Sequence, residues 1–132
     1  MKPTRYLLIA LSAVLMVLAA LPAAGAAESD TAGGEVVVAD RASGTISVID
    51  AGSDELIGSH QLPMGNNPPE PMYVSYVKSG HRLFVGDRAN DRVVVLDADD
   101  YSVVTTIPAG KGVFHQWSDP RDRQLWINND ID

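Results

Sequence analysis

A histidine between aromatic side chains is the strongest candidate for chemistry in this sequence. His115 lies in the segment Phe114-His115-Gln116-Trp117. An imidazole in such a place can bind a metal ion or carry a proton. The alternative is a packing role, in which the ring is hydrogen-bonded to a neighbouring backbone group. One histidine does not make a metal site, so further ligands would have to come from other parts of the protein.

The other two histidines and one acidic turn are weaker candidates. His60 is expected on an edge strand and His81 in a turn beside Gly80, both in contact with solvent. Residues 97–100 carry three carboxylates, and carboxylate oxygens are ligands that Ca²⁺ prefers. The full spacing of a calcium-binding loop is absent, however, so this segment is predicted to be an exposed turn.

The tripeptide Asp-Arg-Ala occurs twice, with the pairs Asp40-Arg41 and Asp87-Arg88, each time between two apolar runs. A repeated pair of this kind predicts a structural turn, in which the carboxylate accepts hydrogen bonds from backbone amides and the arginine lies outward. If both turns face the same mouth of the fold, these four residues also form a charged rim that could contact a partner.

Several kinds of active site are excluded by the sequence. The chain has no cysteine, which excludes a thiol nucleophile, a disulfide and a C-x-x-C-H haem attachment site. It also lacks a G-x-S-x-G nucleophile turn and a glycine-rich phosphate loop. A binding protein is therefore favoured over an enzyme, and the residues identify no particular cofactor.

The first 26 residues have the features of a secretory signal peptide. Lys2 and Arg5 form a positive head, residues 7–21 are almost wholly apolar, and Ala24-Gly25-Ala26 fits an A-x-A cleavage site. The alternative is an uncleaved membrane anchor, since about 20 apolar residues can span a bilayer. The small residues at the end of the segment favour cleavage. We therefore expect a signal-peptide helix, export to the periplasm or the extracellular space, and no membrane insertion after cleavage.

The charge of the chain limits its partners. Loss of the two basic residues of the signal peptide changes the formal net charge from −7 to −9. An acidic surface repels phosphate groups, so nucleic acids and anionic membranes are poor partners. The acidity suits a soluble exported protein or one that meets cationic partners, and its simplest role is to keep the protein soluble.

An internal repeat positions the candidate residues. Residues 36–50 align with residues 83–97 at a shift of 47. The second copy contains three short apolar runs, at 83–85, 93–96 and 103–107, bounded by Asp, Asn and Gly, which is typical of β-strands joined in hairpins. Repeats of roughly 40–50 residues with about four strands are typical of β-propeller blades. The sequence thus predicts an all-β fold of four-stranded antiparallel blades.

The predicted blades follow a short lead-in. Residues 27–34 are small and polar and are expected to be flexible. Residues 35–132 are predicted to form about two and a half blades, over 35–62, 72–110 and 113–132, with the proline-rich segment 63–71 as a connection, because proline lacks a ladder donor.

Two further expectations follow from this division. The first blade begins at its second strand, residues 35–39, which is predicted to be buried on both faces. His115 falls on the innermost strand of its blade, beside the central channel, while Trp117 and Trp126 are predicted to pack between blades. Propellers close with about 4–8 blades, so we expect an incomplete ring and the N-terminal piece of a longer protein.

The repeat resembles the YVTN-type propeller family of exported bacterial and archaeal proteins. The motifs LFVGD and LWINN correspond to the first half of its signature, and ISVID and VVVLD to the second. Asp40 and Asp87 stand where the family usually has Asn, which only Asn129 keeps. The resemblance implies an exported propeller that acts as a binding or interaction scaffold, with a protein or small-molecule ligand at the propeller mouth. Similarity to periplasmic dehydrogenase and reductase propellers implies an alternative, in which the channel holds a metal or redox cofactor and His115 contributes.

Overall fold

The computed structural model describes residues 33–131. The predicted signal-peptide helix at 1–26 lies outside the described residues, as does most of the lead-in at 27–34. The described residues form an all-β structure, as predicted. No helix among them is long and apolar enough to cross a membrane.

The strands follow the predicted apolar runs. Those at 83–85, 93–96 and 103–107 lie in three consecutive strands, which extend beyond their runs by one to three residues in total. Two of the connecting turns contain a single turn of 3-10 helix. The elements are β1 (Glu35–Asp40), β2 (Thr45–Asp50), β3 (Leu56–Gln61), β4 (Pro71–Val77), η1 (Lys78–Gly80), β5 (Arg82–Asp87), η2 (Arg88–Asn90), β6 (Arg92–Asp97), β7 (Val103–Pro108), β8 (Val113–Ser118) and β9 (Leu125–Asn129).

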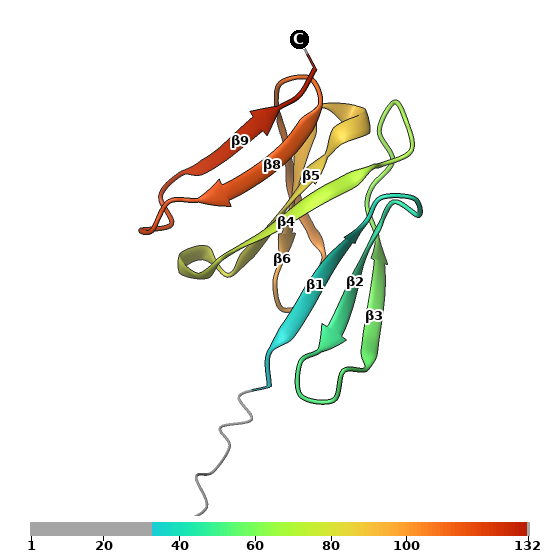
Figure 1. The fold of residues 1–132 in the computed structure, drawn as a ribbon, viewed down its shortest axis with the longest axis vertical. Helices are drawn as coiled ribbons and strands as arrows, with labels where there is room; N and C mark the ends of the chain where they lie inside the picture. Colours follow the sequence, from blue (N-terminus) through green and yellow to red (C-terminus); the bar gives the residue numbers. More distant parts are fainter. Residues whose placement is uncertain (1–32, 132) are drawn as a thin grey trace, which may run out of the picture. The chain divides into compact units, whose positions relative to one another are not determined.

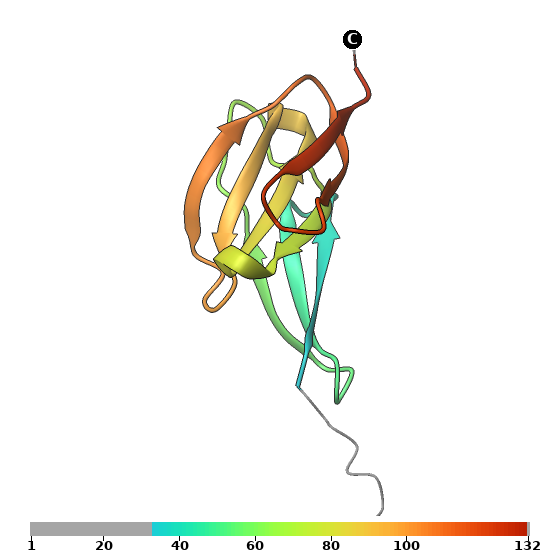
Figure 2. The same ribbon diagram turned by 90° about the vertical axis from the view of Figure 1, so that its left-hand side faces the viewer.

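The strands form three antiparallel sheets, none of which is closed. Their orders are β1-β2-β3, β4-β5-β6-β7 and β8-β9. Figure 1 shows β4 between β1 and β8, both of which it contacts. Figure 2 shows β7 at the outer edge of the four-stranded sheet. The first sheet has three strands and the last has two, so the four-stranded sheet is the one in which the whole predicted unit is present.

The strand pairing reproduces the internal repeat residue by residue. Glu35 pairs with Asp50 in the first sheet and Arg82 pairs with Asp97 in the second, so both partners are displaced by the predicted 47 residues. The register also shifts at the equivalent place in both sheets, between Val48/Ile49 and between Val95/Leu96. Because even this irregularity is repeated, the two sheets are copies of one structural unit.

The turns are repeated as closely as the strands. Gly44 and Asp91 occupy equivalent positions with φ of 74° and 50°, and Asp54 and Tyr101 do so with φ of 59° and 61°. This left-handed region disfavours most side chains, with Gly, Asn and Asp the usual occupants. Gly44 and the two aspartates therefore suit their turns, whereas Tyr101 is an unusual residue for this conformation.

The core joins the first sheet to the second. Ile46 and Leu62 of the first repeat pack against apolar side chains of β5 and β6. β6 is buried on both faces over residues 93–96, since it lies inside the four-stranded sheet and that sheet is covered by its neighbours. The six buried members of this cluster are Ile46, Leu62, Leu83, Val85, Val94 and Leu96.

The predicted burial of residues 35–39 on both faces is wrong. In β1 the side chain of Val36 is 50% exposed and that of Val38 is also exposed. The reason is that β1 pairs with β2 along one edge alone in the described structure, and β4 covers part of its surface without pairing to it. The run of valines correctly predicted a strand, but it did not mean that both faces of that strand are buried.

Two valines of one sheet provide a test of this core. Val94 is fully buried in β6, whereas Val104 in the neighbouring β7 is half exposed. We expect Val94→Ala to lower the free energy of unfolding by about 2 kcal/mol, because it removes two buried methyl groups and leaves a cavity. Val104→Ala is the matched control and should cost less than about 0.5 kcal/mol. Urea unfolding measures both; equal effects would contradict the described core.

Candidate functional site

A cavity of about 590 Å³ lies between the first two sheets. This is within the size range of small-molecule sites. Its apolar lining continues the core, since Leu83 is a member of the buried cluster and Val37 and Val74 pack against it. Its polar lining comes from strand ends and turns. The lining residues are Gly33, Gly34, Glu35, Val37, Asp50, Val74, Tyr76, His81, Leu83, Ala98, Asp99 and Tyr101.

Tyr101 connects three parts of this site. Its hydroxyl donates a hydrogen bond to the carboxylate of Glu35 at the start of β1. Its ring lies 4.5 Å from the ring of His60 in β3, centroid to centroid. Burial raises the pKa of the Tyr101 phenol, and the hydrogen bond to Glu35 and its negative charge raise it further. Tyr101 therefore remains a neutral hydrogen-bond donor through the neutral pH range.

The expectation for His60 is thus only half correct. β3 is an edge strand, as predicted. The imidazole, however, is half-buried against Tyr101 instead of being surrounded by solvent. This contact joins residues that are far apart in the sequence, so no local pattern around His60 indicated it.

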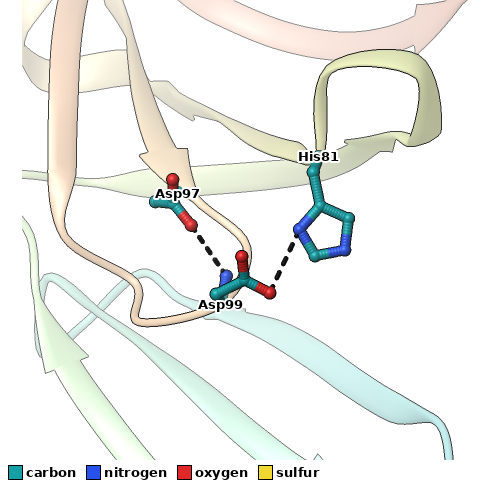
Figure 3. Close-up of side chains that lie close together, drawn as sticks. All are labelled: His81, Asp97 and Asp99. Atoms are coloured by element: carbon teal, nitrogen blue, oxygen red, sulfur yellow. Dashed lines mark hydrogen bonds and ion pairs between the residues drawn. The ribbon is translucent and has the colours of Figure 1, made fainter.

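A second group of polar residues stands at the edge of the cavity, where η1 ends. His81 adopts a left-handed backbone with φ of 50°, and its Nδ1 lies 3.2 Å from Oδ1 of Asp99. The backbone N–H of Asp99 donates to Oδ1 of Asp97 at 2.9 Å. Figure 3 shows the three side chains close together, with His81 from the η1–β5 connection, Asp97 from the end of β6 and Asp99 from the turn that follows. His81 is exposed, as predicted, but it is paired.

This group could offer ligands to a cation, but one of them is already engaged. Potential ligand atoms of His81, Asp97 and Asp99 lie within 4.8 Å of one another. Oδ2 of Asp97 accepts a charged hydrogen bond from Nη1 of Arg82 at 2.7 Å. The guanidinium neutralises this carboxylate and would repel a metal ion, so the group favours an ion pair over a divalent metal.

The acidic turns of the two repeats are held in their ionised form. Oδ1 of Asp50 accepts hydrogen bonds from the backbone N–H groups of Ser53 at 2.7 Å and Gly52 at 2.9 Å. These bonds, together with one from the Ser53 hydroxyl, lower the pKa of Asp50. Hydrogen bonds from Ser102 likewise lower the pKa of Asp100. Residues 98–100 form a turn as predicted, whereas Asp97 is the last residue of β6.

His115 lies on β8 and is exposed. Its ring lies 4.8 Å from Tyr73 on β4 and 4.4 Å from Phe114, measured between centroids. The one group of metal-ligating side chains found among residues 33–131 does not include it. The three rings form an aromatic contact between neighbouring sheets, and the metal-binding role of His115 stays a prediction.

Gln116 has a role that the sequence reasoning missed. Its side chain is 7% exposed, and its Nε2 donates to the backbone carbonyl groups of Tyr73 and Phe84 on two strands of the second sheet. Its Oε1 has no partner within the described residues. The sequence contained one signal for this role. Gln116 aligns with Val74 of the preceding repeat, so a polar residue stands where the other copy has an apolar one.

The two repeated aspartates hold their turns, but mainly through side-chain donors and not through the predicted backbone amides of the turn. Asp87 has 0% of its surface exposed, and its carboxylate accepts from the backbone N–H of Glu70 at 2.9 Å and from Nε of Arg92 at 2.8 Å. Asp40 accepts from the hydroxyl of Ser47 at 2.6 Å. Asp87 therefore has no surface to offer a partner at the rim.

The two repeated arginines do not simply lie outward. Nη2 of Arg41 lies 2.8 Å from the carboxylate of Glu70, which precedes β4. Nη2 of Arg88 lies 3.0 Å from that of Asp130, which follows β9. Each arginine reaches the next repeat along the chain. Both ion pairs are partly exposed, so their positioning effect outweighs their contribution to stability.

The predicted packing of the two tryptophans between blades is not observed. Trp117 and Trp126 are directly paired across β8 and β9. Both are 53–55% exposed. No described residue covers this face of the two-stranded sheet sufficiently to bury them, although their cross-strand pairing fits a β-hairpin.

Comparisons with known proteins provide information about the fold. No family model matches the chain, and no curated protein does. A similar solved structure is the hydrazine synthase of Kuenenia stuttgartiensis, with a TM-score of 0.64, 15% identity, and coverage of 72% of this chain and 26% of that one. The chain spans about a quarter of the length of that protein. At this identity the likeness concerns the fold alone.

The buried ion pair at Asp87 is predicted to be important for stability. Asp87→Ala leaves Arg92, which is 16% exposed, without its charged partner. We expect a loss of about 3 kcal/mol in the free energy of unfolding. Asp99→Ala removes a carboxylate that is 78% exposed and should change it by less than about 0.5 kcal/mol. Urea unfolding measures the loss of stability in both variants. A loss for Asp87→Ala as small as that for Asp99→Ala would contradict the structure.

The raised pKa of Tyr101 makes stability depend on alkaline pH. Its contribution is fully present below the pKa of free tyrosine, about 10, and is lost as the pH rises above that value, because only the unfolded chain then ionises. We expect the urea midpoint to fall more steeply above about pH 10 in the wild type than in Tyr101→Phe. Tyr76→Phe, which keeps Tyr101, should retain the steep fall. Parallel curves for all three proteins would refute this.

Proposed function

We propose that this chain is an exported β-propeller protein of the YVTN type, which acts as a binding scaffold and carries out no reaction itself. Three observations support the propeller: the order of the sheets, the repeated strand register, and the fold similarity to a much longer solved chain. Export is supported by the charge and hydropathy pattern of residues 1–26.

The observation that carries the binding function is the cavity between the first two sheets. It combines apolar side chains continuous with the core and a few polar groups held in place by hydrogen bonds, the usual composition of a ligand site. Its polar groups are engaged with each other in ways that fix their positions, as with Tyr101 and Glu35. A preorganised lining of this kind lowers the entropic cost of binding.

A second surface supports contact with a protein partner. A groove of about 550 Å³ lies where the predicted rim meets the proline-rich connection. Arg41 lines it together with Glu70, its ion-pair partner. The groove residues are Arg41, Ala42, Asn67, Pro68, Pro69, Glu70 and Ala89. Of the four predicted rim residues, Arg41 is the one that contributes to this groove.

The redox-associated alternative depends on His115 and on the resemblance to periplasmic dehydrogenase and reductase propellers. The imidazole lies in an aromatic contact with Tyr73 and Phe114. Hydrazine synthase is the name of an enzyme, but the similarity to it concerns the fold. No observation therefore favours this alternative over binding.

The proposal predicts a ligand that stabilises the full chain through the cavity. Thermal unfolding of the 132-residue protein would be followed in the presence of small organic cations, anions, neutral aromatics and sugars. A ligand at about 100 times its dissociation constant should stabilise the folded state by about 2.7 kcal/mol. Ala98→Phe, which fills the cavity, should abolish the shift, and Ala42→Phe in the groove should preserve it.

The binding function of the cavity would be refuted by either of two results. One is that no compound of these four classes stabilises the wild type. The other is that stabilisation by every active compound persists in a folded Ala98→Phe variant. Unfolding without ligand shows whether each variant is folded.

A further inference from the structure

We propose that the cavity binds a small organic cation, an ammonium or guanidinium group attached to an apolar body. This inference rests on the proposed binding function and names the ligand class of the same site.

The first argument is the charge of the lining. It contains the carboxylates of Glu35, Asp50 and Asp99, and among residues 33–131 no lysine or arginine lines the cavity. Within residues 33–131, neither Glu35 nor Asp50 forms an ion pair with a basic side chain. Turn hydrogen bonds keep Asp50 ionised. Two negative charges at the cavity are thus available to a cation.

The basic groups nearest the cavity do not cancel these charges. His81, a lining residue, faces Asp99 with 3.2 Å between Nδ1 and Oδ1. Arg82, which does not line the cavity, is bound to Asp97 at 2.7 Å. Each basic group therefore has a carboxylate of its own.

The second argument is the pair of tyrosine rings. Tyr76 and Tyr101 both line the cavity, and tyrosine faces attract ammonium and guanidinium groups. Tyr101 is fixed by its hydrogen bond to Glu35 and its contact with His60. Its phenol stays neutral, so it adds no charge. Carboxylates beside aromatic rings favour an organic cation over an anion.

The third argument concerns the apolar lining, which separates an organic cation from a metal ion. Val37, Val74 and Leu83 offer a surface that suits a hydrocarbon body and gives nothing to a bare ion. Among residues 33–131, the one group of three side chains close enough together to share a metal ion is the His81 group at the edge, where Asp97 is already bound to Arg82.

The test uses three probes of similar shape and different charge on the full 132-residue chain. Isothermal titration calorimetry would compare benzylammonium, benzyl alcohol and benzoate. Benzylammonium should bind at least about tenfold more tightly than the other two, a difference of about 1.4 kcal/mol. Its affinity should fall at high salt, since screening weakens partly exposed charge pairs.

Variants that each remove one carboxylate charge test which residues bind benzylammonium. Glu35→Gln keeps an oxygen for the Tyr101 hydroxyl, and Asp50→Asn keeps one for the Ser53 and Gly52 amides. Each should weaken benzylammonium about threefold to fivefold and leave benzyl alcohol unchanged. Glu55→Gln, an exposed carboxylate outside the lining, is the control and should change neither. Equal effects of all three variants would overturn the proposal.

Other outcomes separate this proposal from the binding function itself. If benzoate or benzyl alcohol binds more tightly than benzylammonium, and Ala98→Phe abolishes that binding, the proposed cation specificity is overturned. The proposed binding function of the cavity then stands. Zn²⁺ binding that His81→Ala abolishes, without any benzylammonium binding, would assign a metal site instead. If a Phe-Lys peptide competes with benzylammonium more strongly than free amines do, the cation is supported and its source is a protein side chain.

Discussion

The structure depends on the burial of apolar side chains between its first and second sheets. Leu83, Val85, Val94 and Leu96 of one repeat meet Ile46 and Leu62 of the other, and no single sheet could cover these residues. A twisted sheet buries its faces only against a neighbour, so the repeats stabilise each other in sequence order. The cavity is the place where this packing opens toward the strand ends.

Polar contacts fix the geometry within the second repeat and between it and the third. The buried carboxylate of Asp87 connects the backbone before β4 to Arg92 on β6. Gln116 binds carbonyl groups on two strands of the preceding sheet. Apolar packing is not directional, whereas these hydrogen bonds have preferred lengths and angles. They therefore set the geometry that the hydrophobic core stabilises.

The fold was predictable from local patterns, while much of the site was not. Short valine-rich runs between turn residues gave every strand from 83 to 107, because strand formation and turn chemistry are local properties. The contact of His60 with Tyr101, the buried amide of Gln116 and the exposure of Trp117 depend on which repeat lies beside which. The role of Asp87 was predicted from its repetition, but its complete burial required the neighbouring sheet.

Tyr101 shows how copies of one unit can acquire different properties. Its counterpart Asp54 has almost the same φ and the same turn bond, donated by its backbone N–H to the carbonyl of Asp50 as that of Tyr101 donates to the carbonyl of Asp97. A large side chain in this conformation costs about 1 kcal/mol or more. That strain is offset by contacts Tyr101 makes beyond its own unit. Duplicated turns can therefore diverge in specificity at a single residue while the strand frame remains unchanged.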